Sequence, residues 1–335
     1  MSVAVPYVVG QWVRGTRFYG RRRELANLLS PDRAQWIAGL RRMGKTSLLR
    51  EVGRIAAETP RERPGVALFW DLQGVDGEAD LGLSFTDALL DAEEFLKARD
   101  VVGKDLADAD PRTSCARLLA GLERAGTDLW LLCDEADEVM GWSDAAATLL
   151  RCIWRAVLDA PGGRLVIASS PRLCDRAAAD PRIADLVAGF AAPVYCGALA
   201  EDEARELLAQ THLPLEARPK LDRATAESIA RECGNHPMLL QILGRRLHEL
   251  GDLGEALRQV AADRMLPHLF AVDFDLLAEF ERELLRTLAA REPSGEIDAV
   301  PEAALHRLKA LGLLHSGPEG WRIPNRLFAS WLRRS

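Results

Sequence analysis

The sequence predicts an α/β protein with a parallel, P-loop type β-sheet core, followed by a helical lid and a winged-helix domain. Three observations lead to this fold class. A phosphate-binding motif stands between an expected strand and an expected helix near the N-terminus. Apolar strands and amphipathic helices alternate as far as about residue 200, which is typical of an open parallel sheet. The rest of the chain is helical, apart from a short hairpin near the C-terminus.

The most specific motif covers residues 39–46 (GLRRMGKT), which fit the pattern G-x-x-x-x-G-K-[ST]. Gly39 and Gly44 allow the backbone to wrap closely, so that its N–H groups can point at phosphate oxygens. Lys45 would reach the β- and γ-phosphates, and the hydroxyl of Thr46 would hold Mg²⁺. The alternative is a glycine-containing turn without a ligand.

The flanking residues provide the context that this motif requires. Residues 34–38 are expected to form a strand that runs into the loop, and residues 47–52 continue as an amphipathic helix. The positive N-terminus of that helix favours an anion. Arg42, Met43 and Ser47 are further candidate phosphate contacts, although Arg42 could equally face a partner or solvent.

Further strands are expected where short apolar runs are bounded by glycine, proline or acidic residues. Such runs are typical of strands that are buried on both faces of a sheet. In an open parallel sheet, ligands bind at the carboxyl ends of the strands. The expected strands cover residues 66–72, 128–133, 164–168 and 193–196.

Two adjacent carboxylates, Asp134 and Glu135, follow the strand expected at residues 128–133. In P-loop enzymes the acidic residue at this place holds Mg²⁺, here through a water molecule. A neighbouring glutamate can polarise the attacking water as a general base. The alternative is an acidic strand end that caps a helix. Asp137 and Glu138 are expected to be solvated or to cap a helix.

Polar residues also follow the strand expected at residues 164–168. Ser169 and Ser170 could sense a γ-phosphate through a hydrogen bond, and Arg172 could meet a phosphate of its own or a neighbouring subunit. A polar turn without a ligand explains these residues almost as well.

The second half of the chain has helical periodicity. Residues 234–237 (GNHP) stop one helix and start the next, with Asn235 as a possible N-cap and Pro237 in the first turn. His236 is expected to be structural, since no metal-ligand spacing surrounds it. The expected helices cover residues 201–210, 223–232, 237–250, 274–290, 301–311 and 327–332, and a hairpin turns at 317–320.

Three domains are expected from these elements. They are a nucleotide-binding domain over residues 1–200, a helical lid over 201–270 and a winged helix over 271–335. A chain of 335 residues is long enough for such a division.

The composition limits the function classes. The formal net charge of −7 argues against a basic nucleic-acid binder as a whole. Residues 301–335 nevertheless carry six arginines or lysines against two glutamates, so they could form a solvated basic face or a duplex-DNA footprint. No apolar run reaches the length of a membrane span and residues 1–20 lack a signal-peptide core, so a cytoplasmic location without membrane contact is expected. The six scattered cysteines are expected to be reduced and mostly buried.

In combination, these motifs resemble those of the signal-transduction ATPases called STAND, which are related to the AAA+ ATPases, and of their archaeal and bacterial ATP-binding relatives. The order of the motifs carries the resemblance. Residues 18–25 (FYGRRREL) precede the phosphate loop, Asp134-Glu135 and the polar strand end at 169–170, and the turn at 234–237 and the winged helix follow.

The resemblance implies ATP or ADP with Mg²⁺ as ligands. It would place Tyr19, Gly20 and Arg21 near the adenine, and Pro237 would close the helical lid over the base. The family turn is usually G-x-P, whereas one more residue stands between Gly and Pro here, so Asn235 or His236 could take part in that contact.

The resemblance also implies the roles of the phosphate side. Residues 44–47 would hold the phosphates and Mg²⁺, Asp134 would order the metal, and Glu135 would activate water. Arg245 and Arg246 are the candidates for an arginine sensor on the lid.

The first functional hypothesis is an ATP-driven switch, which hydrolyses ATP to ADP and phosphate slowly or on stimulation by a partner. Its nucleotide state would control the lid and the winged helix, and hence assembly with an unidentified protein or with further copies of the chain. The alternative is a DNA-associated AAA+ ATPase, similar to replication initiators or transposition regulators, that binds duplex DNA through residues 301–335. A third possibility is a nucleotide-binding scaffold in which Glu135 is idle. ATP is favoured over GTP because no N-K-x-D motif is present.

Overall fold

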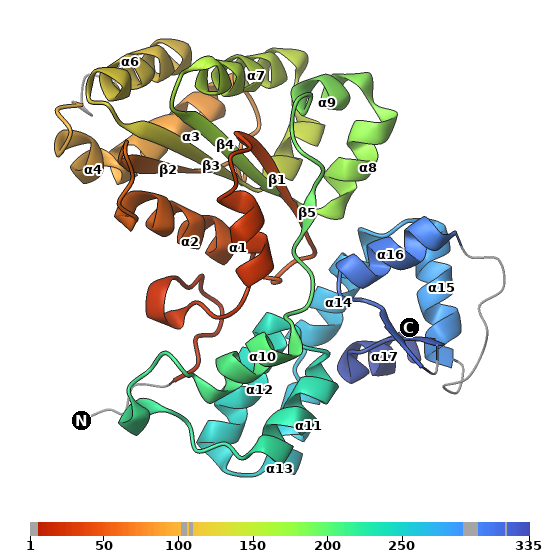
Figure 1. Ribbon diagram of the computed structural model, residues 1–335. Coiled ribbons are helices and arrows are strands. Elements are labelled where there is room, and N and C mark those ends of the chain that lie inside the picture. Colours follow the sequence, from red (N-terminus) through yellow and green to blue (C-terminus); the bar gives the residue numbers. More distant parts are fainter. Residues whose placement is uncertain (1–5, 102–105, 107–109, 291–300, 319) are drawn as a thin grey trace. The chain divides into compact units, whose positions relative to one another are not determined.

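The computed structural model describes residues 6–101, 106, 110–290, 301–318 and 320–335, which form two compact units (Figure 1). The sheet unit consists of Arg23–Ala38 and Lys45–Val194. The helical unit consists of the residues up to Arg22, of Gly39–Gly44 and of Tyr195–Ser335. The phosphate loop is thus grouped with the helical unit up to Gly44, and the helix after it with the sheet unit. The division into three domains at residues 200 and 270 stays a prediction.

A five-stranded sheet has the strand order β2-β3-β4-β1-β5. The pairs β2–β3, β3–β4 and β4–β1 are parallel, as the alternation of strands and helices predicts. The strands are β1 (Ala34–Ala38), β2 (Gly65–Asp71), β3 (Asp128–Asp134), β4 (Gly163–Ser169) and β5 (Val194–Tyr195). Because β4 lies between β1 and β3, the strand before the phosphate loop and the strand before Glu135 are not direct neighbours.

Helices cover both faces of this sheet. Figure 1 shows α2 on one face and α3, α6 and α7 on the other. Helix α7 begins at Asp144, because the Ser143 hydroxyl caps its first turn by accepting the Ala146 N–H. The helices of the sheet unit are α1 (Arg22–Leu28), α2 (Lys45–Glu58), α3 (Glu78–Asp91), α4 (Glu93–Lys97), α6 (Pro111–Arg124), the 3-10 helix η2 (Ala136–Gly141), α7 (Asp144–Asp159), α8 (Pro171–Ala179) and α9 (Pro181–Leu186).

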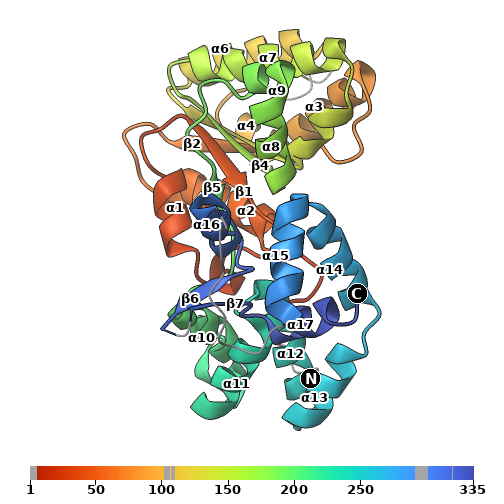
Figure 2. The ribbon, with the colours of Figure 1, turned by 90° about the vertical axis from the view of Figure 1, so that its right-hand side faces the viewer.

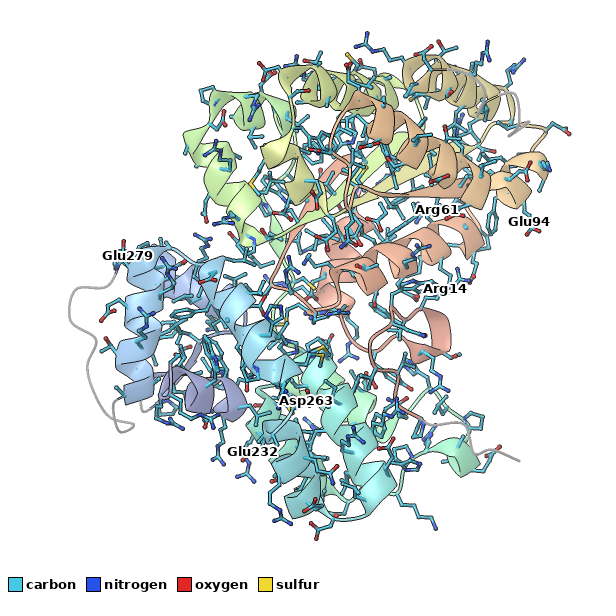
Figure 3. All side chains as sticks on the ribbon, turned by 180° about the vertical axis from the view of Figure 1, so that it is seen from behind. Arg14, Arg61, Glu94, Glu232, Asp263 and Glu279 are labelled. Atoms are coloured by element: carbon cyan, nitrogen blue, oxygen red, sulfur yellow. The ribbon has the colours of Figure 1, made fainter. Side chains whose placement is uncertain are left out.

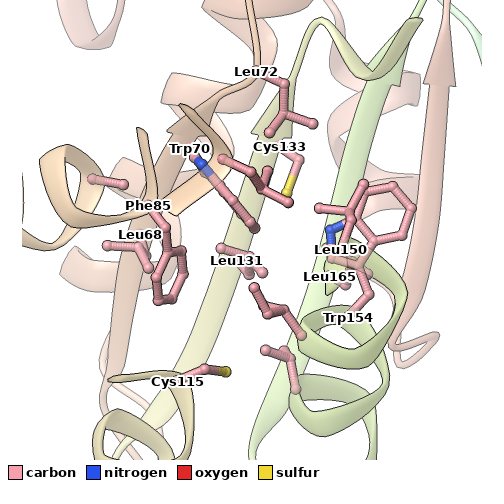
Figure 4. Close-up of a cluster of buried hydrophobic side chains, with 14 of the residues drawn as sticks. Leu68, Trp70, Leu72, Phe85, Cys115, Leu131, Cys133, Leu150, Trp154 and Leu165 are labelled. Carbon is pink, nitrogen blue, oxygen red and sulfur yellow. The ribbon is translucent and has the colours of Figure 1, made fainter. Parts of the chain in front are cut away.

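The main core lies between the sheet and α3, α6 and α7 (Figure 4). Trp70 of β2 meets Phe85 of α3 edge to face, with ring centroids 4.8 Å apart. Trp154 of α7 is 2% exposed and closes the other end of this cluster. Burial of an aromatic ring contributes about 2 kcal/mol or more, so this face holds much of the stability of the sheet unit.

Helix α2 approaches the opposite face closely at Gly53. A Cβ atom added there would lie 2.9 Å from Leu132 Cδ1 and 3.0 Å from Ala67 Cβ. The glycine therefore allows the helix that follows the phosphate loop to contact the sheet directly, which determines the position of the first turn of that helix.

The helical unit contains more helices than the sequence pattern predicted. Residues 253–261 and 265–275 form α13 and α14, and the expected long helix at 274–290 is wrong at its start. Glu281 explains the break, because its side chain returns to accept the Ala278 N–H at 2.9 Å and so begins α15 at Glu279. The elements are η1 (Gly15–Arg17), α10 (Glu201–Ala209), η3 (Leu215–Ala217), α11 (Arg223–Cys233), α12 (Pro237–Leu250), α13 (Leu253–Ala261), α14 (Met265–Asp275), α15 (Glu279–Ala290), α16 (Glu302–Ala310), β6 (His315–Gly317), β7 (Gly320–Arg322) and α17 (Arg326–Leu332).

The C-terminal elements have the order expected of a winged helix, with α15 and α16 before the antiparallel hairpin β6–β7 and α17 after it. Figure 2 shows α14, α15 and α17 side by side. An aromatic cluster joins α14 to α17: Phe274 meets Trp331 at 5.6 Å, and Phe270 meets Phe328 at 5.3 Å between ring centroids. Helix α14 is therefore part of the C-terminal core.

All six cysteines are free thiols, and four of them are buried, as predicted. Cys152 is exposed and Cys174 is half-buried. Within the described residues, no helix combines the length and apolar character that a membrane span requires.

The substitution Gly53→Val tests the contact between α2 and the sheet. We expect it to lower the free energy of unfolding by about 2 kcal/mol, because overpacking of a tight core costs about 1–3 kcal/mol. Urea denaturation measures this change. Gly141→Ala is the control, since its added Cβ would have no atom within 4 Å. Equal effects of the two substitutions would contradict the close approach.

Candidate functional site

The strand register of the sheet unit brings the polar strand ends together. Ala38 pairs with Ser169, and Cys133 pairs with Ile167, so β1, β4 and β3 end at the same edge. Asp134 therefore stands one strand away from Ser169, at the edge where a parallel sheet binds its ligands. Local sequence patterns predicted each of these strand ends, and their pairing places them side by side.

The first turn of α2 meets the end of β3 through one hydrogen bond. The hydroxyl of Thr46 donates to Asp134 Oδ2 at 2.6 Å, and the Glu135 N–H donates to Asp134 Oδ1 at 3.1 Å. Burial raises the pKa of Asp134, while the Thr46 hydroxyl and the Lys45 ammonium group act in the opposite direction. The two predicted Mg²⁺ residues are thus in direct contact, and Lys45 is buried near them.

Glu135, the predicted general base, has an unusual backbone. Its φ angle is +50°, in the left-handed region that side chains other than glycine rarely adopt. Such strain costs about 1–3 kcal/mol and is concentrated at functional sites. The turn after β3 thus pays a cost in stability to place a glutamate directly after Asp134.

Asp137 corrects an expectation, because it is neither free in solvent nor a cap of its own helix. Its carboxylate accepts the Ser170 N–H at 2.6 Å and the Ser170 hydroxyl at 2.5 Å. The Ser170 side chain in turn caps α8 by accepting the Arg172 N–H at 3.2 Å. Asp137 therefore joins the end of β4 to the turn that carries Glu135, which no local pattern indicates.

Ser169 and Arg172 have different surroundings. The Ser169 side chain is fully buried, where its hydroxyl accepts the Trp36 indole N–H at 2.8 Å and donates to the Ser170 carbonyl at 2.9 Å. Arg172 is exposed in the first turn of α8. A sensor role for either residue stays a prediction, and Ser169 would have to exchange these partners to reach a phosphate.

The phosphate loop from Gly39 to Gly44 is supported within the helical unit. A Cβ atom on Gly39 would lie 2.7 Å from the Cys196 carbonyl oxygen, so the loop begins in close contact with the backbone after β5. The Met43 carbonyl accepts the Cys196 thiol at 3.4 Å. Arg42 (φ +60°) and Gly44 (φ +91°) have left-handed backbones, which produce the tight wrap that the motif predicts.

Arg21 supports the same loop. Its guanidinium group is buried and donates to the Met43 carbonyl at 2.8 Å and to the Gly197 carbonyl at 2.6 Å. Gly20 lies against Glu203, where an added Cβ would be only 2.8 Å from the glutamate Cβ. Arg21 thus supports the phosphate loop, and Gly20 packs against the start of α10. A contact of these residues with adenine stays a prediction.

Tyr19 is held by a separate contact. Its ring stacks on His212 with centroids 4.4 Å apart and 15° between the planes, and its hydroxyl accepts the His212 N–H at 3.3 Å. The stack orders the segment after α10.

The turn before α12 contains two successive left-handed residues, Gly234 (φ +56°) and Asn235 (φ +57°). The Asn235 carbonyl accepts the Leu199 N–H at 3.1 Å, and Pro237 occupies the first turn of α12 as predicted. The second left-handed residue accommodates the extra position relative to G-x-P. Contact between Pro237 and a base stays a prediction.

His236 is buried, and its Nδ1 atom has no hydrogen-bond partner among the described residues. Burial, with a smaller contribution from the Arg21 charge, lowers its pKa from 6.5 to about 4. His236 was predicted to be structural, and it is buried in the core as a neutral side chain at neutral pH.

Comparison with solved structures finds proteins of similar architecture. A Walker-type ATPase of Pyrococcus abyssi has a TM-score of 0.69 and 17% identity, over 98% of this chain and 99% of that chain. The ORC2 protein of Aeropyrum pernix, solved as ADPNP–ADP complexes, has a TM-score of 0.50 and 16% identity, over 93% of this chain and 90% of that chain. No protein-family model matches the sequence, and no curated protein is significantly similar to it.

At these identities the similarity concerns the fold. The chain shares the fold of these two solved proteins, with a parallel sheet core and a helical C-terminal region, as the sequence predicted. The roles of individual residues rest on the geometry described above.

The buried His236 predicts a pH dependence of stability. Its folded-state pKa lies below the unfolded value, so protonation favours unfolding. Above about pH 6.5 the histidine should not affect the free energy of unfolding. As the pH drops toward 4, its protonation should lower that free energy by about 3 kcal/mol.

Chemical denaturation of wild type and His236→Asn between pH 7 and 5 measures this dependence. The variant should have the shallower decline, and His268→Asn, at an exposed position, should follow wild type. Parallel curves for wild type and His236→Asn would show that the histidine is not buried in a neutral form.

Proposed function

We propose that the chain binds ATP and ADP with Mg²⁺ on the phosphate loop and hydrolyses ATP to ADP and phosphate. The hydrogen bond of 2.6 Å between Thr46 and Asp134 carries this proposal, because it pairs the hydroxyl of the motif with the acidic strand end. Sequence motifs alone indicate each residue separately. Their contact supports a single metal-binding group.

The chemistry of these donors fits Mg²⁺. This ion prefers oxygen ligands, keeps several of its waters, and is usually bound by one or two carboxylates together with substrate phosphates. Thr46 and Asp134 supply a hydroxyl and a carboxylate, and both groups are oxygen donors. When bound, the ion would neutralise charge on the β- and γ-phosphates.

The remaining steps belong to residues of the chain. The amide groups of the loop and the Lys45 ammonium group would hold the phosphates. The Glu135 carboxylate would orient a water and accept its proton as the water oxygen attacks the γ-phosphorus. Burial raises the pKa of Asp134, and the neighbouring Thr46 hydroxyl and Lys45 ammonium group oppose this shift by favouring the charged form.

We further propose that the nucleotide state acts as a switch. The loop residues 39–44 are grouped with the helical unit, where Arg21 and Cys196 hold Met43. Differential affinity of two conformers for ADP and ATP can therefore reach the helical unit through this loop. The output is assembly with a protein partner or with further copies of the chain.

A protein partner is favoured over duplex DNA by the pairing of basic residues in the C-terminal region. The Arg307 Nε atom lies 3.7 Å from an oxygen of the fully buried Glu281. Arg326 forms an ion pair of 2.8 Å with Glu232, which Figure 3 labels on α11. Lys309 donates to Ser316 at 2.9 Å. The charges of Arg307 and Arg326 are thus partly neutralised within the helical unit, whereas Lys309 keeps its charge beside a neutral hydroxyl; the two ion pairs weaken the DNA alternative.

Turnover of ATP by the purified protein tests the enzyme. We expect slow hydrolysis by wild type and a loss of about 100-fold or more in kcat for Glu135→Gln, since a general base contributes about 10²–10⁴-fold. Glu138→Gln is the matched control, three residues further along the same turn. Unchanged turnover in Glu135→Gln would favour the scaffold hypothesis.

The same assay separates the two functional alternatives. Added duplex DNA is expected to leave turnover unchanged, whereas hydrolysis that requires DNA would put the DNA-associated ATPase first.

Light scattering in ADP and in a non-hydrolysable ATP analogue tests the switch. We expect a larger particle with the analogue, and an equal mass in both states would count against nucleotide-controlled self-assembly.

A further inference from the structure

One amide of the phosphate loop is already bonded to a carboxylate of the chain itself. The Arg41 N–H donates to Asp273 Oδ1 at 2.9 Å. Asp273 is only 6% exposed and lies in the last turn of α14, more than 200 residues further along the chain. The backbone of this loop is built to bind anions, so Asp273 acts on it as an internal anion.

Helix α14 is also attached to α17 through aromatic contacts. Phe270 and Phe274, on the same helix as Asp273, pack against Phe328 and Trp331 of α17. The hydrogen bond of Asp273 therefore connects the phosphate loop to the aromatic cluster of the C-terminal region. Both the loop segment and α14 belong to the helical unit.

We propose that Asp273 is a positioning residue that couples nucleotide binding on the loop to the attachment of α14. This inference rests on the proposed nucleotide site. Phosphates on the loop bring negative charge toward a carboxylate that is shielded from water, and like charges repel more strongly in such surroundings. Nucleotide binding thus weakens the Asp273–Arg41 bond, and by linkage the bond weakens nucleotide binding by the same factor.

The direction of this coupling agrees with a switch that is closed without ligand. An empty loop keeps its internal anion and holds α14, whereas an occupied loop releases it. ATP carries more negative charge than ADP, so the release is greater with ATP. The strength of the Asp273–Arg41 hydrogen bond therefore differs between the ADP-bound and the ATP-bound protein, as a nucleotide-driven switch requires.

Substitution of Asp273 by asparagine tests the charge while keeping an acceptor for the Arg41 N–H. Titration with fluorescent ADP and with a fluorescent non-hydrolysable ATP analogue should show about fivefold tighter binding to Asp273→Asn, at the lower end of usual coupling factors. Asp275→Asn is the matched control, because it removes the same charge from an exposed side chain two residues away on α14. Its affinity should stay within about twofold of wild type.

Hydrogen exchange provides a second readout that a merely structural role would not change. In wild type, the nucleotide should speed exchange of the amides of α14, and in Asp273→Asn this response should be lost. Unchanged or weaker nucleotide affinity in Asp273→Asn, or exchange of α14 that ignores the nucleotide in wild type, would overturn the proposal.

The two proposals can fail separately. If wild type binds neither nucleotide, the proposed function fails. The hydrogen bond between Asp273 and the Arg41 N–H is then tested in the protein without nucleotide. Asp273→Ala removes the acceptor, so hydrogen exchange must become faster in a peptide that covers residues 39–44. Unchanged exchange there would overturn the role of Asp273, whatever the outcome of the nucleotide titration.

Discussion

The hydrogen bond between Thr46 and Asp134 is the interaction on which the candidate site depends. It joins the helix that follows the phosphate loop to a strand that is not a neighbour of β1 in the sheet. A buried carboxylate is costly unless donors satisfy it, so Asp134 can end β3 at this place only because Thr46 and the Glu135 amide reach it. The close approach at Gly53 and the register of β4 bring these groups within reach.

Much of the fold could be predicted because its signals are local. The buried strands are continuous apolar runs, and the phosphate loop is a motif of eight residues in which each type has a physical reason. A metal role for Asp134 and a water-activating role for Glu135 were predicted because both residues directly follow one of these runs, and these roles stay predictions. Such patterns depend on neighbours in sequence, and they hold whatever the rest of the chain does.

The supports of the loop could not be predicted, because they come from distant residues without a pattern of their own. Arg21 was expected near the adenine, and no local pattern indicated that its buried guanidinium group holds the Met43 and Gly197 carbonyls. Asp137 was expected to be solvated or to cap a helix, yet its carboxylate accepts the Ser170 N–H. The start of α15 was missed for a similar reason, since the Glu281 side chain interrupts an apolar periodicity that would otherwise continue through residues 276–278.

The contact of Gly39 with the Cys196 carbonyl has a practical consequence for dissecting the chain. A fragment that ended near residue 195 would contain every residue of the nucleotide motif and the complete parallel sheet. It would nevertheless lack Cys196, Gly197 and the surface against which the loop folds. Loss of nucleotide binding by such a fragment would then report a missing scaffold rather than a missing ligand group. The part of the chain that contains the phosphate-binding motif is therefore shorter than the part that is needed to support its conformation.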